Sequence, residues 1–135
     1  MKLTQQQMQS GLRGDVDFAR WYAEQFMKLH LPQFYFAVSP EGRTEMILNG
    51  RRYAEQHRFT DVRAQVRFVT LMWQIGPNFF VQPGFREVLA DRSGTDMERI
   101  DRLLDVPRDQ AADAILQIDN RYWYPEMVPQ QEGGG

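Results

Sequence analysis

Apolar side chains recur every three or four residues through most of this sequence, and capping residues or prolines bound the repeats. This is the period of an α-helix, whereas a half-buried β-strand alternates every second residue. The strongest repeat begins after Thr60, which we expect to cap the helix, and Gly76-Pro77 ends it. Its apolar stripe contains Val62, Val66, Val69 and Trp73. Because apolar residues also cover its last two turns, we expect this helix to be central and the most buried.

Five further segments show the helical period. They are residues 15–30, 39–58, 85–91, the stretch that follows Thr95, and 108–121. We expect Asp15 to cap the first helix and Leu31-Pro32 to end it, because the residue before a proline avoids the helical region. Thr95 and Glu98 have the spacing of a capping box. The aromatic stretch 33–38 lacks a partner strand, so we expect it to form a buried turn.

The stripes of the first and last helices predict which of their side chains are buried. In the first helix they are Val16, Ala19, Tyr22, Ala23, Phe26 and Leu29. In the last helix they are Ala111, Ala112, Ile115 and Ile118. Together the segments predict an all-α fold, a single compact bundle of five or six helices with short aromatic connectors over residues 15–125. We expect a flexible segment at 1–14 and a disordered tail at 126–135.

Composition narrows the class of protein. A chain of 135 residues fits one domain, and the absence of cysteine excludes disulfides, thiolate metal sites and a cysteine nucleophile. The densest apolar stretch, 68–75, is interrupted by polar residues and is too short to span a membrane. We therefore expect a soluble, cytoplasmic protein with no membrane partner.

Residue patterns typical of catalysis are missing from the sequence. The two histidines, His30 and His57, lack a second ligand at metal-binding spacing, and no phosphate-binding or nucleotide-binding glycine motif is present. Asp101, Asp105 and Asp109 recur at a spacing of four, which is typical of a solvated acidic face. We expect no enzyme, no cofactor and no metal. The alternative is a small enzyme or ligand-binding bundle that uses His57, Tyr53, Asp101 and Asp105.

Charge is distributed unevenly along the chain. The net charge of −2 argues against nucleic acid as the main partner. Residues 43–67 nevertheless carry an excess of arginine, and residues 87–119 carry an excess of acids. Either the two segments pair with each other, or the acidic segment recognises a basic partner. A minor alternative is nucleic-acid binding through Arg51, Arg52, Arg58 and Arg63.

Aromatic residues and arginines suggest where a protein partner would bind. Tyr122-Trp123-Tyr124 lies near the chain terminus, where we expect less core to fill, so this run is our preferred contact. The fourteen arginines against two lysines fit a protein-binding surface, although a GC-rich genome produces the same bias. The candidate protein-binding residues are Tyr122, Trp123, Tyr124, Asp101, Asp105, Asp109, Arg51 and Arg52.

Within residues 44–104, the segments 47–50, 53–54, 59–62, 71–79, Pro83, 89–91 and 99–100 follow one pattern. With this pattern the sequence resembles a family of small helical bacterial proteins encoded beside type VI secretion effectors and PAAR-type spike proteins. The resemblance implies a cytosolic partner of a secreted toxin and carries over no catalytic residue. It is compatible with an accessory protein or co-chaperone that holds the effector or its loading machinery. The alternative is an immunity protein that neutralises a cognate toxin, and the acidic 87–119 region would suit a nuclease with a basic groove.

Overall fold

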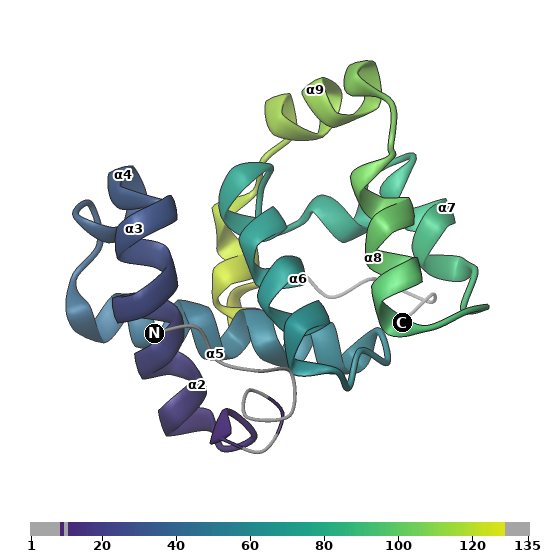
Figure 1. Cartoon of the computed structure of the whole chain (residues 1–135). Helices are drawn as coiled ribbons and strands as arrows, with labels where there is room; N and C mark the ends of the chain where they lie inside the picture. Colours follow the sequence, from purple (N-terminus) through teal and green to yellow (C-terminus); the bar gives the residue numbers. More distant parts are fainter. Residues whose placement is uncertain (1–8, 10, 129–135) are drawn as a thin grey trace.

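The computed structural model describes residue 9 and residues 11–128, and within these residues the chain is all-α without strands (Figure 1). The elements in chain order are α2 (Asp15–Trp21), the π-helix η1 (Tyr22–Met27), α3 (Lys28–His30), α4 (Pro32–Tyr35), α5 (Pro40–Gln56), α6 (Val62–Gln74), the 3-10 helix η2 (Phe79–Val81), α7 (Phe85–Ala90), α8 (Asp96–Leu104), α9 (Arg108–Leu116), and the 3-10 helices η3 (Asn120–Trp123) and η4 (Pro125–Met127). The all-α prediction is confirmed.

The first predicted helix consists of α2, η1 and α3 in direct succession, and it ends before Leu31-Pro32 as expected. Its start differs from the prediction, because Gly14 takes the cap position and Asp15 lies in the first turn. Its buried face also differs, since Val16 and Leu29 are exposed whereas Phe18 and Met27 are buried. The wider turns of the π-helix change the angle between successive side chains, so a face drawn with regular helical spacing does not hold across it.

Packing of α5 against α6 forms the centre of the bundle, and α6 is the buried helix that the sequence predicts. Gly50 allows this close packing: a Cβ atom there would lie 3.1 Å from Val69 Cγ2 and 3.2 Å from Met72 Sδ. Ser39 caps α5 as expected. The cap of α6 is Asp61, not Thr60, because the Asp61 carboxylate accepts from the Arg63 amide at 2.9 Å.

At the other side of the bundle, α8 packs on both α6 and α7. Its capping box is present: Thr95 Oγ1 accepts from the Glu98 amide at 3.1 Å, and Glu98 Oε1 accepts from the Thr95 amide at 2.7 Å. The stretch 33–38, expected to be a buried turn, contains the short helix α4, and Phe36 is exposed.

The last helix, α9, is shorter and more exposed than predicted. It ends at Leu116 instead of residue 121, and only Ala114 is buried on it. Asn78 explains the early end, because its side-chain amide donates to the Gln117 carbonyl and its oxygen accepts from the Asp119 amide, both at 3.0 Å. The expected burial of Ala112, Ile115 and Ile118 is therefore wrong. The exposed side chains are Ala112, Ile115, Leu116 and Ile118.

The C-terminal aromatic run completes the core. Trp123 is only 4% exposed, and its ring centroid lies 4.2 Å from that of Trp73 on α6. Asn49 Nδ2 donates to the Trp123 carbonyl at 2.8 Å, and the Tyr53 hydroxyl donates to the Tyr122 carbonyl at 2.7 Å. Residues 120–124 are therefore attached to α5 and α6 by both packing and hydrogen bonds.

The expected flexible start and disordered tail fall mostly outside the described residues. Of the part that is described, Leu12 is buried, and Pro125–Met127 form η4.

Truncation of Trp73 tests the aromatic contact between α6 and the C-terminal run. Trp73→Ala should lower the free energy of unfolding by about 3–5 kcal/mol, because it removes a large buried ring and leaves a cavity. The matched control is Phe36→Ala, since Phe36 is 73% exposed. Denaturant titration measures both, and equal small losses would contradict the core position of Trp73.

A buried arginine also connects three parts of the bundle. Arg51 on α5 is 4% exposed, and its guanidinium donates to Gln65 Oε1 at 3.0 Å, to the Leu12 carbonyl at 3.0 Å and to Asp15 Oδ1 at 3.1 Å. The same group lies 4.2 Å from the centroid of the Phe18 ring. Arg51 therefore joins α5 to α6 and to the start of α2.

Arg51→Ala should cost about 3 kcal/mol of unfolding free energy, because it leaves buried acceptors on Gln65 and Leu12 without their donor. The neighbouring Arg52 is exposed and donates one hydrogen bond, to Asn49 Oδ1, so Arg52→Ala should cost no more than about 1 kcal/mol. Denaturant unfolding of the two variants side by side gives the comparison. A similar loss for both would show that the Arg51 contacts contribute little.

Candidate protein-binding groove

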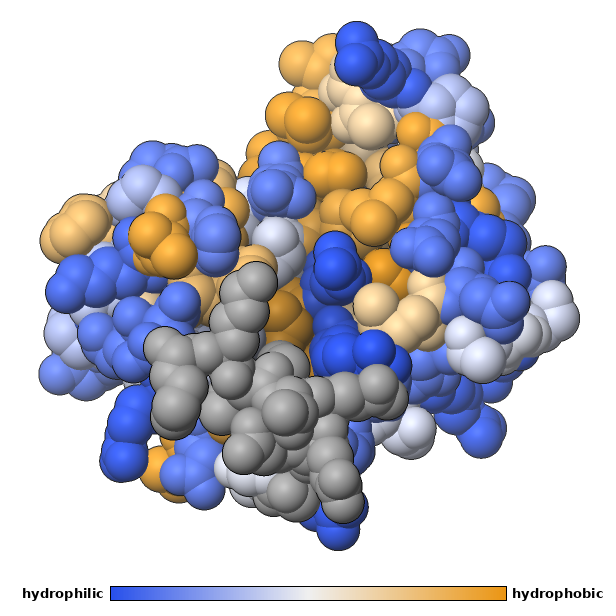
Figure 2. Space-filling view, viewed as in Figure 1, coloured by the Kyte–Doolittle hydropathy of each residue, from blue (hydrophilic) through white to orange (hydrophobic). Residues whose placement is uncertain are grey.

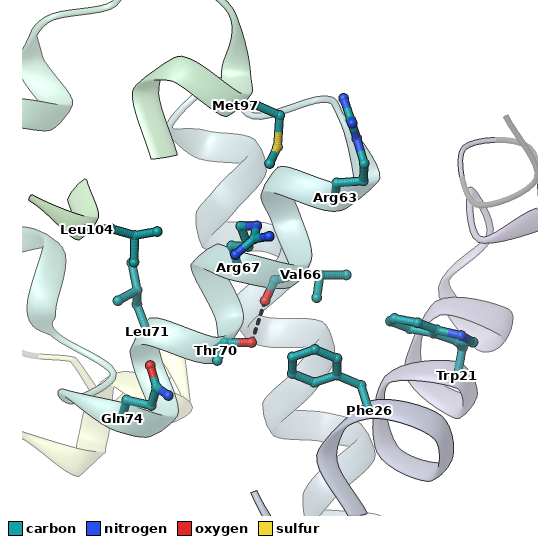
Figure 3. A pocket seen from close by; sticks show the side chains of 10 residues that line it. All are labelled: Trp21, Phe26, Arg63, Val66, Arg67, Thr70, Leu71, Gln74, Met97 and Leu104. Carbon is teal, nitrogen blue, oxygen red and sulfur yellow. Dashed lines mark hydrogen bonds between the residues drawn. The ribbon is translucent and has the colours of Figure 1, made fainter. Parts of the chain in front are cut away.

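An elongated hollow follows the exposed side of α6 and encloses about 420 Å³. One wall consists of Trp21 and Phe26, from α2 and η1, and the other consists of Met97 and Leu104 from α8 (Figure 3). The floor is α6 itself. Its lining residues are Arg63, Val66, Arg67, Thr70, Leu71 and Gln74. We call this hollow the α6 groove.

The floor residues follow the helical period, so one stripe of α6 provides the whole floor. The opposite stripe is buried against α5, as Gly50 permits. Thr70 contributes little polarity, since its hydroxyl donates to the Val66 carbonyl at 2.7 Å and lies 2.9 Å from the Tyr22 hydroxyl. The hydrogen-bonding capacity of Thr70 is thus largely used within the protein.

Positive charge in the α6 groove comes from two arginines one helical turn apart. Arg63 pairs with Asp61 at 2.8 Å, and this hydrogen-bonded pairing holds the pKa of the Asp61 carboxyl below its ordinary value. Arg67 is exposed and makes no ion pair with any residue in the described part of the chain. Among the described residues that line the groove, none is a carboxylate. An occupant therefore meets apolar walls and one cation, Arg67, that is not already paired with a described carboxylate.

Apolar surface continues beyond the groove towards α9. Figure 2 shows a band of hydrophobic side chains that extends from the middle of this face towards α9. Large exposed hydrophobic residues in this part of the chain are Leu104, Ile115, Leu116 and Ile118. Leu104 also belongs to the groove wall.

The structure does not bring the predicted binding residues together. Trp123 is in the core, and Tyr122 and Tyr124 are half-buried beside it. Arg51 is buried and bonded internally, so it is not available on the surface, while the exposed Arg52 donates to Asn49 Oδ1 at 2.9 Å. Of these five residues, Trp123 and Arg51 are therefore interior, Tyr122 and Tyr124 are partly accessible, and only Arg52 is exposed.

The three predicted aspartates are exposed but come from different places. Asp101 lies in α8, Asp105 is the residue that ends α8, and Asp109 lies in the first turn of α9. None of the three forms an ion pair with a described residue. They are solvated acids, as the spacing indicated.

The basic segment 43–67 and the acidic segment 87–119 do not pair with each other through their charges. The four ion pairs found among the described residues all lie elsewhere or within one segment. The Asp96 carboxylate instead accepts from the backbone amides of Thr60 and Asp61, each at 2.8 Å. Arg99 donates to the His57 carbonyl at 3.0 Å.

Of the residues weighed for catalysis, His57 and Tyr53 pack on the aromatic core. The His57 ring centroid lies 5.7 Å from that of Phe68 and 5.2 Å from that of Phe80. Burial, and secondarily the charge of Arg99, lower the pKa of His57. Burial raises the pKa of Tyr53 to about 12. Within the described residues, no hydrogen bond links His57 or Tyr53 to Asp101 or Asp105, and no group of acids and histidines is placed to hold a metal ion.

His57 predicts a pH dependence of stability. Because its pKa in the folded protein lies below the ordinary 6.5, the unfolded chain takes up a proton first as the pH falls. Stability should therefore decrease as the pH falls through about 6.5, and His57→Phe should reduce this decrease. Denaturant titrations at about pH 7.5 and about pH 5.5 measure it. An identical decrease in both proteins would contradict the prediction.

The α6 groove is the feature that sequence reasoning missed. Its signal was present, since Arg63, Arg67 and Gln74 interrupt the apolar pattern of the central helix at helical spacing. That signal marks an exposed stripe, but not the walls that turn a stripe into a groove.

No described helix is both long and apolar enough to cross a membrane. No protein-family model, curated protein or solved structure matches this chain. The resemblance of residues 44–104 to the helical bacterial family stays a prediction.

Proposed function

We propose that this protein is a non-catalytic protein-binding module and that its α6 groove holds an amphipathic helix of the partner. The observation that carries the proposal is the composition of the groove: apolar side chains on both walls, the unpaired Arg67 beside Arg63 on the floor, and no carboxylate among the described lining residues. Grooves between helices commonly bind a helix through apolar residues at successive turns.

The partner helix should combine apolar and acidic residues. Its apolar side chains would pack on Trp21 and Phe26 from one side and on Met97 and Leu104 from the other. An acidic residue would face Arg67, whose charge has no counter-ion within the described chain. Such charge complementarity favours specific over non-specific apolar partners and speeds association.

The resemblance to proteins encoded beside type VI secretion effectors supplies the biological context. On that basis we propose that the partner is such an effector or its loading machinery, and that the protein acts as an accessory protein or co-chaperone. The second candidate is an immunity protein for a cognate toxin. Its support is the exposed Asp101, Asp105 and Asp109, which have no ion-pair partner in the described structure and could face a basic toxin groove.

Capture from the native host tests the groove directly. Tagged wild-type protein should retain the effector or its chaperone, and Arg67→Glu should reduce retention at least about tenfold, because like charges meet across the interface. Arg20→Glu on α2 is the matched control, since Arg20 is exposed and does not line the groove. Recovery of neither protein by the wild type, or equal loss in both variants, would refute the proposal.

A growth assay separates the two roles. Deletion of the gene in the native host should leave growth normal and block effector secretion if the protein is an accessory factor. Death of the deletion strain, with rescue by inactivation of the neighbouring toxin, would assign the immunity role instead.

A further inference from the structure

Helix α9 presents an apolar stripe to solvent. Its inner side is defined by Ala114, which is buried, by Gln110, whose side chain lies against Gly84, and by Gln117, whose carbonyl accepts from Asn78. At 100° per residue the opposite side consists of Ala112, Ile115 and Leu116. All three are exposed, and Leu116 is 78% exposed. No described part of the chain covers this stripe.

Acidic residues border the α9 stripe on one edge. Asp109 and Asp113 are four residues apart, and helical geometry places both beside Leu116. Neither forms an ion pair with a described residue. The α6 groove has a complementary charge, because Arg67 lies between apolar walls and forms no ion pair with a described residue, whereas Arg63 one turn away is paired with Asp61.

We propose that the α9 helix of a second copy of this chain docks into the α6 groove, with its apolar stripe on the groove walls and Asp113 beside Arg67. This inference rests on the proposed function in one respect, namely that the groove accepts a helix. The amphipathic acidic helix required there is present in the protein's own sequence.

The helix must come from another molecule. Within one chain, Asn78 holds the residues that follow α9, and Gln110 lies against Gly84, so the apolar stripe faces away from the body that carries the groove. The groove and α9 both contribute to the face shown in Figure 2. Two copies related by a two-fold axis can therefore dock so that the α9 helix of each copy covers the groove of the other.

Self-association of this kind regulates partner binding. The partner helix and the second copy's α9 require the same walls and the same Arg67, so they exclude each other. The dimer is then a resting form that protects the apolar groove, and partner binding converts it to a one-to-one complex.

Complementary charge reversals test the dimer. Sedimentation equilibrium of the full chain over a range of concentrations should give a monomer–dimer equilibrium. Arg67→Glu alone and Asp113→Arg alone should each weaken dimerisation at least about tenfold, because each places like charges together. An equimolar mixture of the two variants should dimerise again, since every groove and helix pair then has opposite charges. A wild type that stays monomeric, growth beyond a dimer, or a mixture that stays monomeric would overturn the proposal.

An apolar variant tests the same interface without altering the arginines. Leu116→Asp should abolish the dimer, and Leu29→Asp is its matched control because Leu29 on α3 is 71% exposed. Circular dichroism of both variants verifies that the fold is retained. Equal dimerisation of Leu116→Asp and wild type would overturn the inference.

Failure of this inference is distinguishable from failure of the proposed function. If the protein is a monomer that still captures its effector or chaperone, and Arg67→Glu loses this capture, the groove is supported as a partner site and the dimer is refuted. If the protein dimerises with the expected charge-reversal pattern but captures no partner, the α9 contact is supported and the proposed function is refuted.

Discussion

Packing of α5 on one face of α6 is the contact on which the rest of this structure depends. Gly50 allows the two helices to approach until its Cα faces Val69 and Met72, and no larger residue fits there without movement of those side chains. Because α5 occupies that face, α6 can expose only the opposite stripe. The packing of η1 and α8 on either side then turns the stripe into the floor of a groove.

Arginine has two different roles in this protein. Arg43, Arg51 and Arg99 are buried. Each guanidinium lies in van der Waals contact with an aromatic ring and also donates to a backbone carbonyl. Lysine could not do this, since it has no planar group that stacks and bonds in several directions at once. Arg67, by contrast, is solvated in the groove. Part of the excess of arginine over lysine therefore serves the interior.

The α6 groove and α9 have complementary surfaces that the folding of a single chain does not require. A solvated arginine between apolar walls and an exposed apolar stripe beside two aspartates add nothing evident to the stability of one chain. Surfaces of this kind are typical of sites that contact other proteins. A second copy and a partner helix would compete for one groove. The fraction of the protein that is available to the partner would then depend on the protein's own concentration.

The sequence alone determined most of the helix boundaries, because caps and stops act through neighbouring residues. Thr95 with Glu98, Ser39, and Leu31-Pro32 all behave as expected. It also determined that α6 is the buried helix. Burial on the other helices was decided by tertiary structure: Val16, Leu29 and Ile115 are exposed although their spacing is that of a core face.

Only the tertiary structure decided the end of α9, the interior position of Arg51 and Trp123, and the α6 groove. Asn78 bonds to residues about forty positions later in the chain, and Arg51 bonds to Leu12, Asp15 and Gln65. Periodicity shows which side chains share a helix face, because that depends on local geometry. Whether another element covers that face depends on contacts between residues far apart in the sequence, which no local pattern records.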